Sequence, residues 1–193
     1  MSVAERIGKI EASRVKRREA LLVIMNELAS QQVGCHSCVG VCCTFVKNSM
    51  MVTPVEAFDL LAFADRKAWD RQWLREKLQS CVKRFSLDRG VPSDGQRVFS
   101  RRTYTCPFFD EETSLCGISP EFKPYGCLGY NARRVGEKEG GSCRSDVEAL
   151  QKREKSLTEE EQLNDAIRRS YQLEWHKQPI PLALLSLMEK ANI

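Results

Sequence analysis

The feature that most constrains the fold of this chain is a run of cysteines, C-H-S-C-V-G-V-C-C, at residues 35–43. The whole chain holds nine cysteines in 193 residues. Thiolates are soft ligands that favour zinc, copper(I) and iron–sulfur clusters. Packing alone does not need so dense a group of thiols, so the run predicts a metal or cluster site. The candidate metal ligands are Cys35, Cys38, Cys42, Cys43, Cys106, Cys116, Cys127 and Cys143.

The spacing within the run narrows the kind of site. Cys35 and Cys38 form a C-x2-C pair, in which a tight turn aims both sulfurs at one ion. Cys42 and Cys43 are neighbours, and neighbouring side chains diverge. They therefore suit two adjacent centres, or one cluster ligand with a second thiol held close by. The spacing does not match the C-x2-C-x2-C-x3-C ferredoxin run, and Val39 after Cys38 excludes the haem-attachment motif.

Composition and the N-terminal residues limit the compartment and the partners. A net charge of +4 gives no general argument for nucleic acid. The basic run Arg14–Arg18 is interpreted as a solvated helix face, because Glu11 and Glu19 flank it. The apolar run Ala20–Met25 is too short for a signal peptide or a membrane span. We therefore expect a cytoplasmic protein with no membrane partner, in which reduced thiols bind metal rather than form disulfides.

Local signals predict helices at both ends of the chain. A helix is expected over 2–32, and Gly34 ends it. A second helix runs from Pro54 to about residue 65, with Thr53 and Glu56 as a capping box. A third is expected over 67–86, with Trp69 and Trp73 in the core. Two or three more are expected, near 145–155, 158–176 and 181–190. Cys81, within the third helix, is interpreted as a buried apolar residue.

The middle of the chain favours β-structure and irregular loops. Residues 97–105 are rich in β-branched and aromatic residues, which predicts a strand. A short hairpin is expected with its turn at Asp110–Ser114, and if it is centred near Glu111, Cys106 lies opposite Cys116. The segment 119–144 is expected to be irregular. The predicted fold is mainly α, with a small β-hairpin and irregular cysteine-rich metal-binding loops.

The predicted organisation is a single domain made of three segments. The segments are an N-terminal helix (1–33), a cysteine-cluster metal-binding region (34–144) and C-terminal helices that pack on the same core (145–193).

The cysteine pattern resembles a known family. The ordered elements are Cys35-x2-Cys38-x3-Cys42-Cys43, then Cys106-Pro-Phe-Phe-Asp, then Cys116-Gly-Ile, then Lys123-Pro-x-x-Cys127. Together they resemble the CxxCxxCC family, often called YkgJ-like, which is described as a zinc- or iron-chelating domain. The helix with Thr53 and Glu56 is similar to the family's pattern as well. Two departures are the three residues between Cys38 and Cys42, and a lysine at position 123 where an arginine is usual. Lysine keeps the charge but loses the planar fork that binds a carboxylate through two hydrogen bonds.

The resemblance implies metal binding and leaves three functions open. The first is a redox or accessory protein that holds an iron–sulfur cluster, of the 4Fe-4S type, or zinc for an unidentified protein partner. The second is a zinc-stabilised module that binds protein or nucleic acid, the latter through Arg14–Arg18 and Arg133–Arg134. The third is a protein-modifying enzyme, since flagellin lysine N-methylases carry a similar cysteine block. A single cluster needs four thiolates, whereas two zinc sites need eight and would include Cys143. The oligomeric state is open as well.

Overall fold

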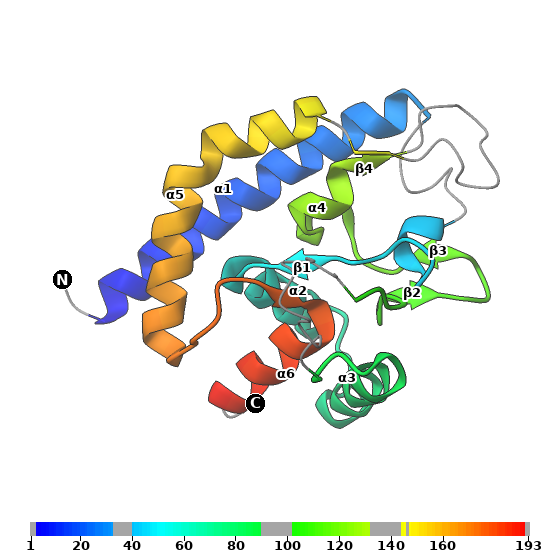
Figure 1. The fold of residues 1–193 in the computed structure, drawn as a ribbon. Helices are drawn as coiled ribbons and strands as arrows, with labels where there is room; N and C mark the ends of the chain where they lie inside the picture. Colours follow the sequence, from blue (N-terminus) through cyan, green and yellow to red (C-terminus); the bar gives the residue numbers. More distant parts are fainter. Residues whose placement is uncertain (1–2, 33–39, 90–101, 132–143, 146, 192–193) are drawn as a thin grey trace, which may run out of the picture.

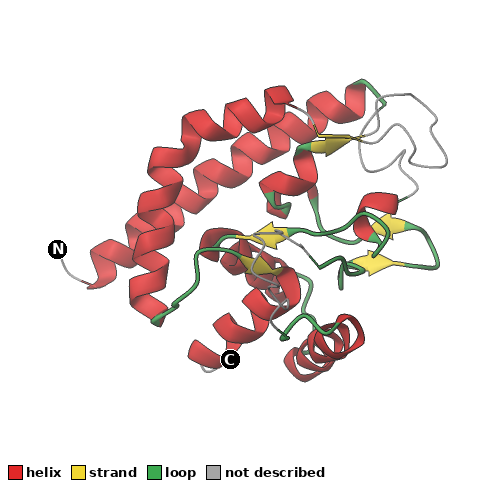
Figure 2. Cartoon of the chain, viewed as in Figure 1, coloured by secondary structure: helices red, strands yellow, loops and turns green. Residues whose placement is uncertain are grey.

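The computed structural model describes residues 3–32, 40–89, 102–131, 144–145 and 147–191. In these ranges the protein is mainly helical, as the sequence predicts (Figures 1 and 2). The α-helices are α1 (Val3–Ser30), α2 (Pro54–Arg66), α3 (Arg71–Phe85), α4 (Tyr125–Leu128), α5 (Val147–Tyr171) and α6 (Ile180–Lys190). Two short 3-10 helices are η2 (Val41–Cys43) and η3 (Pro120–Phe122). Within the described ranges, no helix is both long and apolar enough to cross a membrane.

The described ranges contain three two-stranded antiparallel sheets, and one of them joins segments that are far apart in the chain. They pair β1 (Met51–Val52) with β6 (Gln178–Pro179), β2 (Phe109–Asp110) with β3 (Leu115–Cys116), and β4 (Tyr130–Asn131) with β5 (Arg144–Ser145). The described part of the predicted strand at 97–105 is not a strand. Its Tyr104 N–H donates to the carbonyl of Asn48 at 2.9 Å, but no ladder of paired strands forms there. The other residues of that prediction, 97–101, lie outside the described ranges.

The two long helices α1 and α5 lie side by side, and α2, α3 and α6 pack against one another beneath them (Figure 1). Helix α5 is continuous from Val147 to Tyr171, so the prediction of two helices at 145–155 and 158–176 is wrong. No glycine or proline lies between these ends, so nothing in the backbone chemistry breaks the helix there. Helix α6 begins at Ile180, close to its predicted start.

Helix α2 begins as its sequence predicts. The Thr53 N–H donates to Glu56 Oε2 at 2.8 Å, and Pro54 occupies the first turn. Most of the helix is buried against α5 and α6. The predicted start of the next helix at residue 67 is wrong. Ala68 has φ +51°, which breaks the helix, and the Asp70 carboxylate caps α3 by accepting from the Trp73 N–H at 2.7 Å.

The core joins α2, α3 and α6 to the extended segment after residue 102. Tyr104 is fully buried in it; its hydroxyl donates to the Met50 carbonyl at 2.6 Å and accepts from the Ile180 N–H at 3.0 Å. Trp69 packs on this core, but Trp73 is 45% exposed, so the prediction that both belong to the core is wrong for Trp73.

The interpretation of the basic run on α1 as a solvated face is wrong for two of its arginines, although Lys16 in the same run is exposed. Arg14 and Arg17 are buried, at 4% and 6% exposed. Both donate to the fully buried carboxylate of Asp59 on α2, at 2.8 and 2.7 Å. Arg17 also donates to Glu160 on α5 at 2.9 Å. Burial opposes the charge of Arg17, but Glu56, Asp59 and Glu160 outweigh it and raise its pKa. The network therefore joins α1, α2 and α5.

Candidate metal centre

Cys42 and Cys43 lie in η2, and Cys43 is joined directly to Cys106 through the backbone. The Cys106 N–H donates to the Cys43 carbonyl at 2.7 Å. The turn into η2 depends on Gly40, which has φ +70°. A Cβ at this position would lie 2.3 Å from Cε2 of Phe109. Glycine therefore allows the Cys42–Cys43 segment to lie directly against the hairpin that carries Cys116.

The predicted hairpin exists, but its register differs from the prediction. Cys116 pairs with Phe109, whereas the sequence placed it opposite Cys106, which lies before β2 begins. The turn sets this register. The Asp110 carboxylate accepts hydrogen bonds from the Glu112 N–H at 2.9 Å and the Thr113 hydroxyl at 2.8 Å. These bonds hold the turn after Asp110, at the position that the sequence predicts.

The thiols of Cys43, Cys106 and Cys116 nevertheless gather in one place. Cys43 hydrogen-bonds to Cys116 and to its neighbour Cys42, and these bonds, together with burial, raise the pKa of Cys43 well above the usual range. Burial and the charge of Cys116 likewise raise the pKa of Cys106. The pKa of Cys116 falls to about 6, because Cys43 donates a hydrogen bond to it and Lys123 lies beside it, which together outweigh burial. The group therefore holds one thiolate readily and resists further ionisation without a cation.

Lys123 supplies a buried positive charge to these thiols. Its side chain is almost completely buried, at 2% exposed, on the segment that follows η3. It hydrogen-bonds to Cys116, and its charge also acts on Cys106. The arginine that is usual at this position in the family could bind a carboxylate through two hydrogen bonds. The described partners of Lys123 in the centre are sulfur atoms instead. A buried ammonium next to thiolates offsets part of their mutual repulsion.

Cys127 lies on the short helix α4, which long-range contacts hold in place. The buried Glu56 carboxylate, which already caps α2, accepts from the Tyr125 N–H at 2.9 Å. The guanidinium of Arg17 lies 5.1 Å from the centre of the Tyr125 ring. Burial raises the pKa of Tyr104, and the charges of Cys106 and Cys127 raise it further. Both thiols therefore act on the same hydroxyl, and Glu56 holds the helix that carries Cys127.

Cys35, Cys38 and Cys143 lie outside the described residues, as does the segment that follows Asn131 up to residue 143. Cys81 is buried on α3 and donates to the Thr105 carbonyl at 3.4 Å, which confirms the prediction that it is buried. Burial raises its pKa to about 11.

The donor set fits a soft metal or cluster in its chemistry, because it combines thiols with one buried cation. Among the described residues, no three histidine, cysteine, aspartate or glutamate side chains are arranged as ligands of a single ion. Any metal site that uses these thiols would therefore need further ligands from residues outside the described ranges.

Sequence reasoning identified the cysteines but missed what Lys123 and Glu56 do among them. Their signals were present in the Lys-Pro-x-x-Cys element and in the capping box. Neither signal indicates that Lys123 lies beside sulfur atoms or that Glu56 also holds helix α4. Comparisons of the chain with protein-family models, with curated proteins and with solved structures find no match.

Proposed function

We propose that this protein binds an iron–sulfur cluster or zinc through thiolates, and acts as a redox or accessory protein for a partner protein. One observation carries the proposal: Cys43 comes from a distant part of the chain and still lies with Cys106 and Cys116, with Lys123 buried beside these thiols. Buried cysteines of purely structural origin do not require a buried cation among them, whereas thiolate ligands benefit from one.

The protonation chemistry supports the same conclusion. Metal ligands must be deprotonated, so metal binding releases protons from thiols. Burial and neighbouring thiols oppose the ionisation of Cys43 and Cys106, and a bound cation removes that penalty. When bound, an iron–sulfur cluster would supply electron transfer. The hydrogen bond from Lys123 to Cys116 is of the kind that tunes the potential of such a centre.

The family resemblance indicates which cysteines could complete the set of metal ligands. Four thiolates for one cluster would come from seven candidates, which are Cys35, Cys38, Cys42, Cys43, Cys106, Cys116 and Cys127. Two zinc sites would use all eight candidates, including Cys143. Membership of the CxxCxxCC family is part of this proposal.

The structure weakens one alternative function. A nucleic-acid interface was expected to use the basic run Arg14–Arg18 and the pair Arg133–Arg134, and the pair lies outside the described residues. Arg14 and Arg17 of that run are buried in ion pairs, so their charges do not face solvent. A protein partner is therefore the better proposal for an interaction module. A protein-modifying enzyme would need a ligand site of its own beside the thiols.

Elemental analysis with an absorption spectrum, on protein purified without oxygen, tests the proposal. Broad visible absorption with iron and acid-labile sulfide in similar amounts would support the cluster. A colourless protein with one or two zinc ions per chain would refute the cluster and keep thiolate binding. Protein that binds neither metal on reconstitution would refute the proposal altogether.

Three serine variants sharpen the assignment. Cys43→Ser should lower the metal content, while Cys81→Ser is the control, because Cys81 is a buried cysteine that is not a proposed ligand. Cys143→Ser should halve the zinc content if there are two zinc sites, and should leave a single cluster intact.

A further inference from the structure

A cleft of about 600 Å³ opens between α3 and the segment that leads into β2. Its size lies within the range of about 300–1,000 Å³ that is typical of small-molecule sites. Cys106 lines it from the segment and Cys81 lines it from α3. The cleft therefore lies beside the thiols but contains side chains that the proposed metal site does not use.

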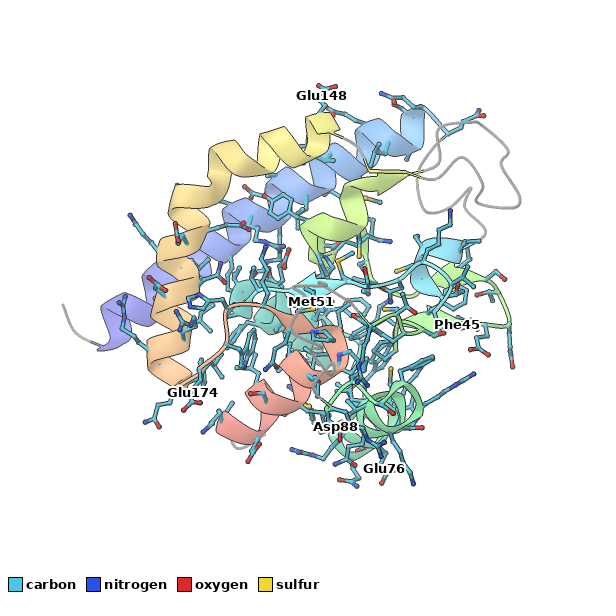
Figure 3. The ribbon with its side chains drawn as sticks, in the orientation of Figure 1. Phe45, Met51, Glu76, Asp88, Glu148 and Glu174 are labelled. Atoms are coloured by element: carbon cyan, nitrogen blue, oxygen red, sulfur yellow. The ribbon has the colours of Figure 1, made fainter. Side chains whose placement is uncertain are left out.

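Aromatic rings dominate the apolar lining of this cleft. Trp69 and Phe108 both line it and stack on each other, with ring centres 5.6 Å apart and planes 19° apart. Phe85 also lines it and stacks on Phe45, which is 53% exposed. Figure 3 places Phe45 on the side of the molecule that carries the β2–β3 hairpin. Trp73 is exposed as well and packs edge-on against Trp69. Exposed aromatic rings next to lining rings mark a place where an apolar ligand would gain contact area.

The charges of the lining are divided between its two walls. Lys77 and Arg84 come from α3, while Asp110, Glu111 and Glu112 come from the hairpin turn. Asp110 already accepts two hydrogen bonds within the turn and is fully exposed. Lys77 is the one charged lining residue that is half-buried rather than exposed. Water screens exposed charges most strongly. The half-buried positive charge of Lys77 would therefore interact with a bound ligand more strongly than the exposed charges do.

The cations are also held against aromatic rings. The ammonium of Lys77 lies 5.0 Å from the centre of the Trp73 ring, and the guanidinium of Arg84 lies 5.3 Å from that of Phe85. Positive charge and aromatic surface are therefore presented together at this cleft. A ligand that combines a planar aromatic body with an anionic group matches both features.

We infer that the cleft is a binding site for an aromatic small molecule that carries an anionic group. The aromatic body lies against Trp69, Phe85 and Phe108, and the anion lies toward Lys77 and Arg84. Because Cys106 lines the same cleft, the bound molecule lies beside the thiol centre. This site goes beyond the proposed metal binding and does not require it.

Fluorescence titration with 8-anilinonaphthalene-1-sulfonate, an aromatic sulfonate, tests the inference on the full chain. The expected result is one saturable site per chain. Lys77→Ala should weaken the affinity by roughly three- to tenfold, the loss expected for one half-buried charged contact. Ser80→Trp should abolish binding, because Ser80 lines the cleft and tryptophan would fill it. Gln79→Trp is the matched control, because Gln79 is the adjacent residue and lines a separate pocket of about 250 Å³.

The outcomes separate this inference from the proposed function. Thermal unfolding followed by circular dichroism confirms that each variant is folded. Binding that survives in a folded Ser80→Trp variant, or that is lost equally in Gln79→Trp, would overturn the inference. Unchanged affinity in Lys77→Ala, or tighter binding of the cationic dye thioflavin T, would overturn the assignment of an anionic ligand. The titration is done with both metal-loaded and chelator-treated protein. If the protein binds no metal but still binds the sulfonate at the cleft, only the proposed function is refuted.

Discussion

Removal of one carboxylate from the arginine network should destabilise the protein strongly. Asp59 is fully buried and accepts hydrogen bonds from Arg14 at 2.8 Å and from Arg17 at 2.7 Å. Asp59→Ala would remove this carboxylate from two buried guanidinium groups, and Glu56 at 3.6 Å and Glu160 at 2.9 Å would be the remaining anions beside Arg17. Breaking a buried ion pair by removing one partner costs about 3–5 kcal/mol. We expect a loss of this size in the free energy of unfolding.

Urea denaturation measures this loss directly. With a denaturant slope of about 2 kcal/mol per molar urea, the midpoint should fall by about 1.5–2.5 M. Asp65→Ala is the matched control, because Asp65 lies on the same helix and pairs with Arg71 at the surface. Exposed pairs contribute about 1 kcal/mol or less, so this control should shift the midpoint little. Equal shifts for the two variants would refute the reasoning that burial sets the strength of the network.

Three further changes test the centre and its supports. Gly40→Ala should lower the free energy of unfolding by about 2–4 kcal/mol, because the backbone has φ +70° and a Cβ would meet the Phe109 ring; urea denaturation measures it. Glu56→Gln should lower the metal content and lower the free energy of unfolding by about 1.5–3 kcal/mol. Glutamine can accept only one of the two backbone hydrogen bonds that Glu56 accepts, and metal analysis and urea denaturation measure the two effects. Lys123→Met should raise the pKa of Cys116 above its value of about 6 in metal-free protein, and the pH dependence of alkylation measures it.

Each of these predictions has a result that contradicts it. A Gly40→Ala protein with an unchanged urea midpoint would show that the segment before Cys42 tolerates a side chain. Equal metal content in Glu56→Gln and in the surface control Glu121→Gln would remove the positioning role of Glu56.

For Cys116 the folded pKa lies below the ordinary value of 9.0, so its ionised form stabilises metal-free protein fully above pH 9. That contribution is lost as the pH falls to about 6. If the pKa of Cys116 is the same in Lys123→Met as in the exposed control Lys67→Met, Lys123 does not act on the thiolate.

Local signals predicted the helices whose ends are set by neighbouring residues. The cap of α2 involves Thr53 and Glu56, three residues apart, and both the sequence and the structure place it at the same point. The turn after Asp110 was predictable for the same reason. The start of α3 was missed because the Asp70 cap competes with the helical pattern that begins before it.

Contacts between distant residues were not predictable from the sequence. The partners of Arg14 and Arg17 on α2 lie 45 and 42 residues away, and Glu160 lies 143 residues from Arg17. Nothing next to the arginines indicates that they are buried, and the flanking glutamates favoured the opposite interpretation. The cysteines were identified from composition. Their grouping depends on a backbone hydrogen bond between Cys43 and Cys106, which are far apart in the chain, and this contact has no local signal.

The hydroxyl of Tyr104 has a consequence for the order in which the chain folds. Its two partners, Met50 and Ile180, lie 54 and 76 residues away in opposite directions along the sequence. Closing loops of this length costs chain entropy before any contact compensates it, so contacts of this range form late. Cys106 lies two residues after Tyr104, and we expect it to meet Cys43 only once α6 has docked. Thiols that must wait for the C-terminal helix are exposed to stray metals and oxidants during folding, and the rate at which α6 docks sets how long that exposure lasts.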